Sequence, residues 1–208
     1  MIFDNLEDFH ENSALINDNS SITYKELISL SDSLCDTIPS RSIVLLFCDN
    51  SIESLCAYIG FLRNRIVPIM VNNKTDLGSV ANIIKRFQPN YIFNCVDSFN
   101  MLGYNILVNN AKYRIYEAID KTRTIVVDNL ALLLTTSGST GSPKFVKISY
   151  ENLESNTSSI CKYLNISASD RAITSLPIFY SFGLSIINTH LYAGASLVVT
   201  NESFLSRS

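Results

Sequence analysis

The sequence predicts an α/β fold, a layered domain with mostly parallel sheets flanked by helices. Apolar runs of strand length alternate along the chain with segments of helical period, which is the pattern of strands joined through helices. The run at 43–47 is apolar throughout, as expected for a strand that is covered on both faces. With 208 residues, 47% of them hydrophobic, the chain is long enough to bury a substantial core.

The first half of the chain supplies most of this alternation. Pro39 is expected to end the first helix, and Asp49, Asn50 and Ser51 offer N-caps for the second. Pro68 lies inside a strand, so that strand is expected near a sheet edge or a bulge. The expected elements are a strand at 22–24, a helix at 25–38, a strand at 43–47, a helix at 52–62, a strand at 66–71, a helix at 80–87 and a strand at 91–93.

The second half has a weaker pattern at first and a clear one later. Between 94 and 128 only short strands and turns are expected. Strands at 130–135 and 145–149, helices at 152–164 and 182–192, and a strand at 196–200 follow. Residues 201–208 carry no signal that closes the last layer, so we expect a truncated chain.

Composition excludes several classes of protein. The net charge of -3 gives no basic surface for nucleic acid. The acidic N-terminus lacks a signal peptide, and the apolar runs are too short to span a bilayer, so we expect a cytoplasmic protein. The cysteines form no CxxC pair and the two histidines lie far apart, so no metal site is predicted. The cysteines are instead expected as small buried residues: Cys35, Cys48, Cys56, Cys95 and Cys161.

The most informative stretch is TTSGSTGSPK at 135–144, between an apolar run and an alternating one. Gly138 and Gly141 permit backbone conformations in which successive N–H groups point into one concavity. Hydroxyl groups lie between them, and Lys144 adds a compact positive charge. These groups together suit a polyphosphate.

Two familiar nucleotide-binding loops do not match this stretch. A Walker loop would open a helix, whereas here Lys144 follows Gly141 by three residues and the next segment alternates like a strand. A GxGxxG pattern is absent as well. Two alternatives to a dedicated phosphate site stay open: a hairpin connection rich in Ser, Thr and Gly with a solvated lysine, and a generic nucleotide-binding α/β domain with a fortuitous loop.

The stretch resembles the phosphate-binding signature of the acyl-adenylate-forming (AMP-binding) superfamily, which includes acyl-CoA synthetases, luciferases and the adenylation domains of nonribosomal peptide synthetases. The family pattern is (S/T)SG(S/T)TGxPKGV, and TSGSTGSPKFV departs from it only at Phe145, where the family has glycine. Three further blocks extend the resemblance along nearly the whole chain: ITYKEL at 22–27, the block at 51–71, in which Asn64 and Arg65 replace the usual Ala-Gly, and LPIFYSFGL at 176–184.

The resemblance implies an activity and a set of site residues. A carboxylic acid would attack the α-phosphate of ATP to give acyl-AMP and pyrophosphate, and the acyl group would pass to coenzyme A or to the pantetheine of an acyl carrier protein. Mg2+ would accompany ATP. Lys144 is the implied catalytic residue. The implied ATP-binding residues are Thr136, Ser137, Gly138, Ser139, Thr140, Gly141 and Lys144.

The resemblance also makes residues 1–208 the N-terminal portion of an adenylate-forming domain. The family's magnesium-binding and ribose-binding motifs would follow after this portion, so the fragment alone is expected to be inactive. The alternative function is a non-catalytic short chain that binds nucleotide or a partner protein. The identity of the acid, the choice of thiol acceptor and the oligomeric state stay open.

Aromatic residues near the end of the chain are candidates for an acyl pocket. Phe179, Tyr180 and Phe182 belong to the block that precedes this pocket in the family, and a core role is the alternative for them. His190 lies on an apolar helical segment and is expected to be a core histidine whose hydrogen bonds are satisfied.

Overall fold

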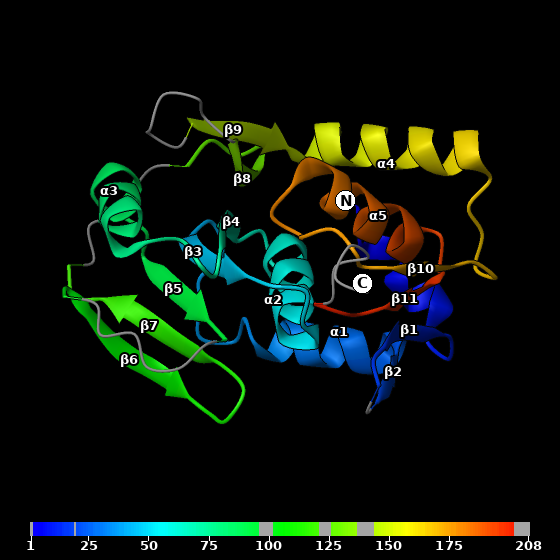
Figure 1. The fold of residues 1–208 in the computed structure, drawn as a ribbon, viewed down its shortest axis with the longest axis horizontal. Helices are drawn as coiled ribbons and strands as arrows, with labels where there is room; N and C mark the ends of the chain where they lie inside the picture. Colours follow the sequence, from blue (N-terminus) through cyan, green and yellow to red (C-terminus); the bar gives the residue numbers. More distant parts are fainter. Residues whose placement is uncertain (1, 19, 96–101, 121–125, 137–143, 202–208) are drawn as a thin grey trace, which may run out of the picture.

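The computed structural model describes residues 2–18, 20–95, 102–120, 126–136 and 144–201, and two sheets organise them (Figure 1). The larger sheet contains β3 (Ile43–Cys48), β4 (Val67–Asn72), β5 (Tyr91–Asn94), β6 (Tyr104–Asn109), β7 (Arg114–Ala118), β8 (Leu130–Thr136) and β9 (Lys144–Ser149), in the order β6-β7-β5-β3-β4-β8-β9. The smaller sheet contains β1 (Ser13–Ile16), β2 (Ser21–Thr23), β10 (Arg171–Ile173) and β11 (Ser196–Val198), in the order β10-β11-β1-β2.

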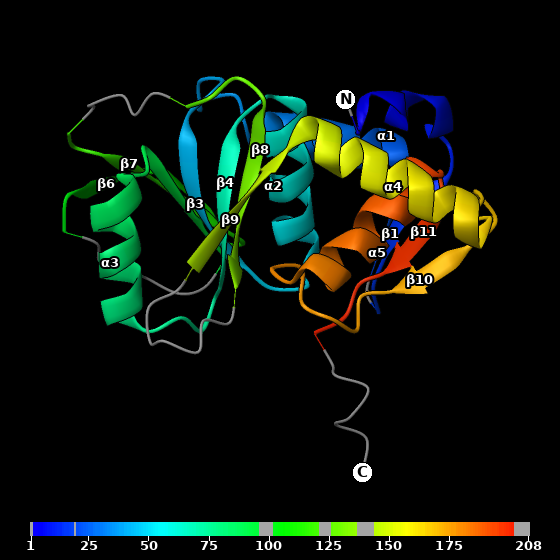
Figure 2. The same ribbon diagram turned by 90° about the horizontal axis from the view of Figure 1, so that it is seen from above.

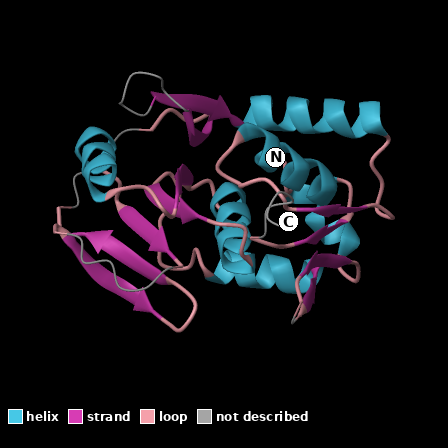
Figure 3. Ribbon diagram, viewed as in Figure 1, coloured by secondary structure: helices cyan, strands magenta, loops and turns pink. Residues whose placement is uncertain are grey.

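Helices cover these sheets on several sides (Figures 1 and 3). They are η1 (Asp4–Phe9, a 3-10 helix), α1 (Tyr24–Ser33), α2 (Ile52–Arg63), α3 (Leu77–Phe87), α4 (Tyr150–Leu164) and α5 (Ser181–Tyr192). Figure 2 shows α3 on one face of the larger sheet and α2 on the other, between that sheet and the helices of the smaller one. No helix in the described ranges is both long enough and apolar enough to cross a membrane.

The predicted α/β class is confirmed. Strands β5, β3, β4 and β8 run parallel at the centre of the larger sheet, and antiparallel pairings at both of its edges add β7, β6 and β9. In the smaller sheet β10, β11 and β1 are parallel.

Strand β3 shows why its sequence is apolar throughout. Ile43, Leu45 and Phe47 belong to the core cluster that includes the buried side chains of α3. Val44 and Leu46 belong to the cluster that includes α2. Because successive side chains of a strand point to opposite faces, a strand covered on both sides must be apolar at every position.

The expected edge position of Pro68 is wrong, because β4 lies between β3 and β8. The N–H of Val67 donates to the carbonyl of Ser42 on the β3 side, so the Pro68 nitrogen faces β8. Pairing between β4 and β8 begins only at Ile69. The proline therefore occupies the start of a central strand, where its missing N–H costs no ladder bond.

Helix α1 is shorter than predicted. It begins after Thr23, whose side chain and that of Glu26 form a reciprocal capping box, and it ends at Ser33. Residues 34–38 form turns instead, with Leu34 and Ile38 still buried. The spacing of apolar residues therefore correctly indicated that this segment is buried, but it predicted a helix that is too long.

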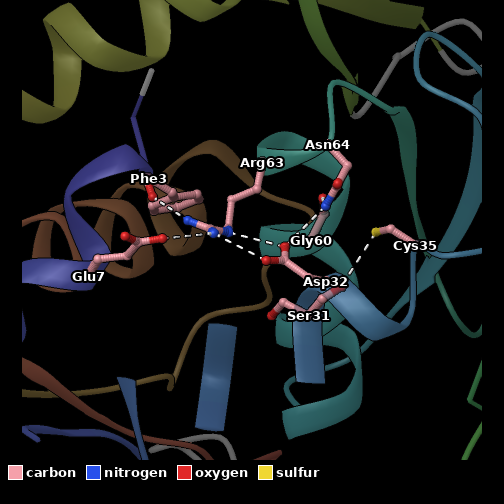
Figure 4. Close-up of polar contacts among 8 residues, drawn as sticks. All are labelled: Phe3, Glu7, Ser31, Asp32, Cys35, Gly60, Arg63 and Asn64. Carbon is pink, nitrogen blue, oxygen red and sulfur yellow. Dashed lines mark hydrogen bonds and ion pairs between the residues drawn. The ribbon is translucent and has the colours of Figure 1, made fainter. Parts of the chain in front are cut away.

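Helices α1 and α2 pack closely against each other, and polar contacts join them to the N-terminal segment (Figure 4). A Cβ atom on Gly60 would lie 2.2 Å from the carbonyl oxygen of Ser31, so only glycine allows this approach. The guanidinium of Arg63 donates to both carboxylate oxygens of Asp32 at 3.2 Å and to the carbonyl of Phe3 at 2.9 Å. This cluster joins the N-terminal segment to both helices, and we assign it a structural role.

Candidate functional site

The signature loop connects two antiparallel strands of the larger sheet. Thr136, the last residue of β8, pairs with Lys144, the first residue of β9. Since β4 and β8 run parallel, this end of the hairpin lies at the carboxyl edge of the parallel strands, where ligands of open α/β sheets bind. Five of the predicted ATP-binding residues fall in the stretch 137–143, outside the described residues: Ser137, Gly138, Ser139, Thr140 and Gly141.

Strand β9 presents two different faces beyond Lys144. Phe145 points toward α3, where its ring meets that of Phe87 edge-on at a centroid distance of 4.7 Å. The guanidinium of Arg86 lies 5.8 Å from the centre of the Phe145 ring. Alternation along the strand then directs Val146 to the opposite face. The residue that replaces the family's glycine thus packs the strand against α3.

A groove of about 550 Å³ lies on the Val146 side of β9. This volume is within the range of about 300–1,000 Å³ that is typical of small-molecule sites. The groove runs between the β8–β9 hairpin, the first half of α4 and the first two turns of α5. Its lining residues are Leu134, Val146, Lys147, Ile148, Asn152, Leu153, Asn156, Ser181, Phe182, Leu184, Ser185 and Asn188.

One lining residue, Asn188, has a side-chain amide that is buried and hydrogen-bonded. Asn188 is only 3% exposed, and its Oδ1 accepts a hydrogen bond of 2.8 Å from the hydroxyl of Tyr58. Burial raises the pKa of Tyr58, which keeps this hydroxyl protonated and able to donate. The Tyr58 bond therefore fixes the Asn188 side chain, so that its NH2 group is the donor left for other partners.

The three candidate pocket aromatics have different environments. Phe182 is 66% exposed and lines the groove. Phe179 is buried, and Tyr180 is half exposed with its ring 4.6 Å from that of Phe179. Neither of these two is among the groove-lining residues. A pocket role stays a prediction for all three, and Phe182 is the one whose position suits it.

Asn50 holds the segment before α5 in place. Its side-chain amide donates to the carbonyls of Thr174 and Leu176, and its Oδ1 accepts from the N–H of Ile178. Asn50 lies just after β3 and is 8% exposed. One buried side chain therefore joins the carboxyl end of a central strand to the segment that leads into the groove.

His190, Cys35 and Cys56 show no arrangement for catalysis within the part of the chain that the structure describes, and of the five cysteines expected to be buried, Cys95 and Cys161 are only partly buried. His190 is partly buried, and its Nδ1 lies 2.9 Å from the carbonyl of Ile186, one turn earlier on α5. Burial raises the pKa of Cys35 and Cys56 to about 12, so both remain unreactive thiols at neutral pH. Across the described ranges no group of three or more His, Cys, Asp or Glu residues could hold a metal ion.

Comparison with known families identifies the family of the chain. The sequence profile described as AMP-binding enzyme matches residues 2–207. The chain belongs to the AMP-binding enzyme family. This membership excludes a generic nucleotide-binding domain with a fortuitous loop, and it agrees with the resemblance carried by the 136–146 signature.

The chain is similar to parts of much longer fungal synthetases. The chain is 24% identical over 198 residues to malformin synthetase mlfA of Aspergillus vadensis, in a match that covers 89% of this chain and 4% of that protein. It is 28% identical over 199 residues to nonribosomal peptide synthetase 13 of Aspergillus fumigatus, in a match that covers 89% of the chain and 9% of the relative. The chain thus spans less than a tenth of the length of these relatives.

Solved structures of AMP-binding enzymes share the fold. O-succinylbenzoate coenzyme A synthetase of Bacillus subtilis in complex with AMP matches with a TM-score of 0.77 and 21% identity, over 99% of this chain and 56% of that one. ATP-bound MatB of Rhodopseudomonas palustris matches with a TM-score of 0.72 and 20% identity, over 97% of this chain and 44% of that one. These likenesses establish the architecture.

Several groove residues carry no clear signal in the sequence. Asn152 and Asn156 line the groove one helical turn apart on α4, and Asn188 and Tyr58 form its buried polar contact. Asn188 alone could have been found, because it is an amide directly after the apolar pair Ile186 and Ile187, and such a residue must find a partner when buried.

Proposed function

We propose that this chain supplies the phosphate-binding loop and part of the acyl pocket of an ATP-dependent acyl-adenylate-forming enzyme. The observation that supports this most is the position of the signature hairpin beside the groove. Val146 of the groove lies two residues along β9 from Lys144, which is roughly 7 Å in a strand. Adenylation needs a carboxylate next to the α-phosphate of ATP, and adjacent sites satisfy that need.

The proposed reaction joins the two sites. The substrate carboxylate attacks the α-phosphorus of ATP, the bond to the β-phosphate breaks, and acyl-AMP and pyrophosphate form. Lys144, together with the amides and hydroxyls of the signature residues 136–141, stabilises the negative charge that grows on the leaving pyrophosphate. Mg2+ bound with ATP would neutralise further phosphate charge, and we propose no residue of the described chain as its ligand.

The acyl group would then pass to a thiol, with AMP as the leaving group. The candidate acceptors are coenzyme A and the pantetheine of an acyl carrier protein, and the peptide synthetases among the relatives support a carrier protein as partner. All five cysteines are unpaired, which supports the cytoplasm as the location.

We further propose that residues 1–208 form the N-terminal portion of the adenylate-forming domain and do not turn over alone. The solved relatives are about twice as long, and exposed apolar side chains rim the groove at Val146 and Phe182. Further polypeptide that covers this rim would close the pocket around its substrate.

Acid-dependent exchange of pyrophosphate into ATP tests the function in the full-length enzyme. Lys144→Ala should lower the exchange rate by about 10²–10³-fold, or about 3–4 kcal/mol, as expected when one stabilising donor is lost. Lys162→Ala is the matched control, because it removes the same charge at an exposed position in the last turn of α4, outside the groove. Normal exchange in Lys144→Ala, or equal losses in the two variants, would refute the assignment.

A further inference from the structure

We infer that the groove binds the uncharged acyl group of a carboxylic acid that carries no α-ammonium group, an inference that rests on the proposed function. The peptide synthetases among the relatives make an amino acid the obvious alternative. The chemistry of the lining residues favours a different class of acid.

The lining of the groove is apolar with neutral polar groups between. Six side chains offer hydrocarbon or aromatic surface: Leu134, Val146, Ile148, Leu153, Phe182 and Leu184. Five more carry amides or hydroxyls: Asn152, Asn156, Ser181, Ser185 and Asn188. Among the described lining residues none has a carboxylate. Such a surface suits an apolar acyl group with neutral hydrogen-bonding substituents.

Lys147 is the one described lining residue with a charge, and its position on β9 directs that charge elsewhere. Side chains alternate along a strand, so Lys147 shares the face of Phe145 and not that of Val146 and Ile148. Phe145 packs against Phe87 of α3, on the far side of the sheet from the groove. Lys147 therefore contributes its backbone at the open edge of β9, and its ammonium stays outside.

An ammonium group would be disfavoured in this groove for two reasons. Placing it against this apolar lining, with no carboxylate partner among the described lining residues, is unfavourable. The first turn of α5, which holds Ser181 and Phe182, also presents the positive end of the helix dipole and carries no acidic residue. A neutral acyl chain meets neither obstacle.

Three acids that differ only at the α-carbon provide the test: 3-phenylpropionate with hydrogen, L-phenylalanine with an ammonium group and benzylmalonate with a second carboxylate. Each is titrated into the 208-residue chain at pH 7 without nucleotide, and backbone amide shifts are followed by 15N NMR. We expect 3-phenylpropionate to shift groove residues such as Asn156 and Ser185 with a Kd of the order of millimolar, as suits a ligand of this size. The other two acids should bind at least tenfold more weakly.

Two variants locate the binding. Phe182→Ala should weaken 3-phenylpropionate several-fold, and because Phe182 is 66% exposed the variant should keep its fold, which the amide spectrum itself checks. Ser185→Asp adds a carboxylate to the groove wall and should improve L-phenylalanine at least tenfold relative to 3-phenylpropionate.

The inference is overturned if L-phenylalanine binds wild type as tightly as 3-phenylpropionate, if benzylmalonate binds more tightly, or if no acid shifts the groove residues at concentrations up to roughly 20 mM. These titrations contain no ATP. A failure here is therefore distinguishable from a failure of the proposed function, which appears as loss of dependence on Lys144.

Discussion

Arg65 occupies a backbone conformation that belongs to glycine, and replacing it tests how the sequence accommodates that conformation. Its φ is 56°, in the left-handed region. It follows the C-cap of α2, where its N–H donates to the carbonyl of Leu62 and the next N–H, of Ile66, donates to that of Phe61. This is a Schellman ending, which favours glycine at the position of Arg65. Glycine is also the usual residue at this position in the family block that residues 51–71 resemble.

Two contacts of the Arg65 side chain offset part of the strain. The guanidinium donates to the carbonyl of Asp128 at 3.0 Å and lies 5.7 Å from the centre of the Tyr150 ring. Arg65→Ala keeps the strain and loses both contacts, so it should destabilise by about 1–2 kcal/mol. Arg65→Gly loses the same contacts but relieves about 1–2 kcal/mol of strain in the left-handed backbone conformation. Glycine also raises the conformational entropy of the unfolded chain, which offsets about 0.4–1 kcal/mol of that gain.

The difference between these two variants isolates the backbone contribution. The glycine variant should be more stable than the alanine variant by about 1 kcal/mol, or about 2–4 °C in Tm for a chain of this size. Urea unfolding followed by circular dichroism measures it. The control is Lys85, an exposed residue inside α3, where the Lys85→Gly variant should be less stable than the Lys85→Ala variant by about 1 kcal/mol. The same sign at both positions would refute the argument.

Two further predictions concern the strand after the loop and the buried thiols. Phe145→Gly, which restores the family residue, should lower the free energy of unfolding by about 2–3 kcal/mol, because the half-buried aromatic packing against Phe87 is lost. Phe145→Leu should lower it by less than half as much. Equal losses for the two variants in urea unfolding would contradict this prediction. The pKa values of Cys35 and Cys56 are raised to about 12 from 9.0 by burial, so the unfolded chain releases these protons first as pH rises. The contribution of these two thiols to the unfolding free energy should therefore be constant below pH 9 and fall between pH 9 and 12 by as much as about 1.4 kcal/mol per pH unit for each thiol. Cys56→Ala should make that fall shallower, and an unchanged slope would count against its burial.

The central layer of the fold was predictable because its signals are local. The apolar run of β3, the Ser51 cap and the periodicity of α2 each specify one element without reference to the rest. Strands β1 and β10 gave no such signal. They are only four and three residues long, and they are held by pairing with β11, which lies about 180 residues from β1 in the sequence.

The candidate site was predictable in part for the same reason. The signature at 136–146 is contiguous, so its residue types alone indicate phosphate binding. The groove combines two strands with α4 and α5, and its buried contact joins Tyr58 to Asn188, 130 residues apart. No local sequence pattern predicts the contact between these two side chains, because it forms only when the helices pack together.

Thermal unfolding with and without Mg·ATP, for wild type beside Lys144→Ala and Lys162→Ala, tests the central claim most directly. At 100 times its Kd the nucleotide should stabilise wild type and Lys162→Ala by about 2.7 kcal/mol, roughly 5–10 °C in Tm, and should leave Lys144→Ala nearly unshifted. An equal shift in all three proteins, or none in wild type, would contradict a phosphate site at the β8–β9 hairpin.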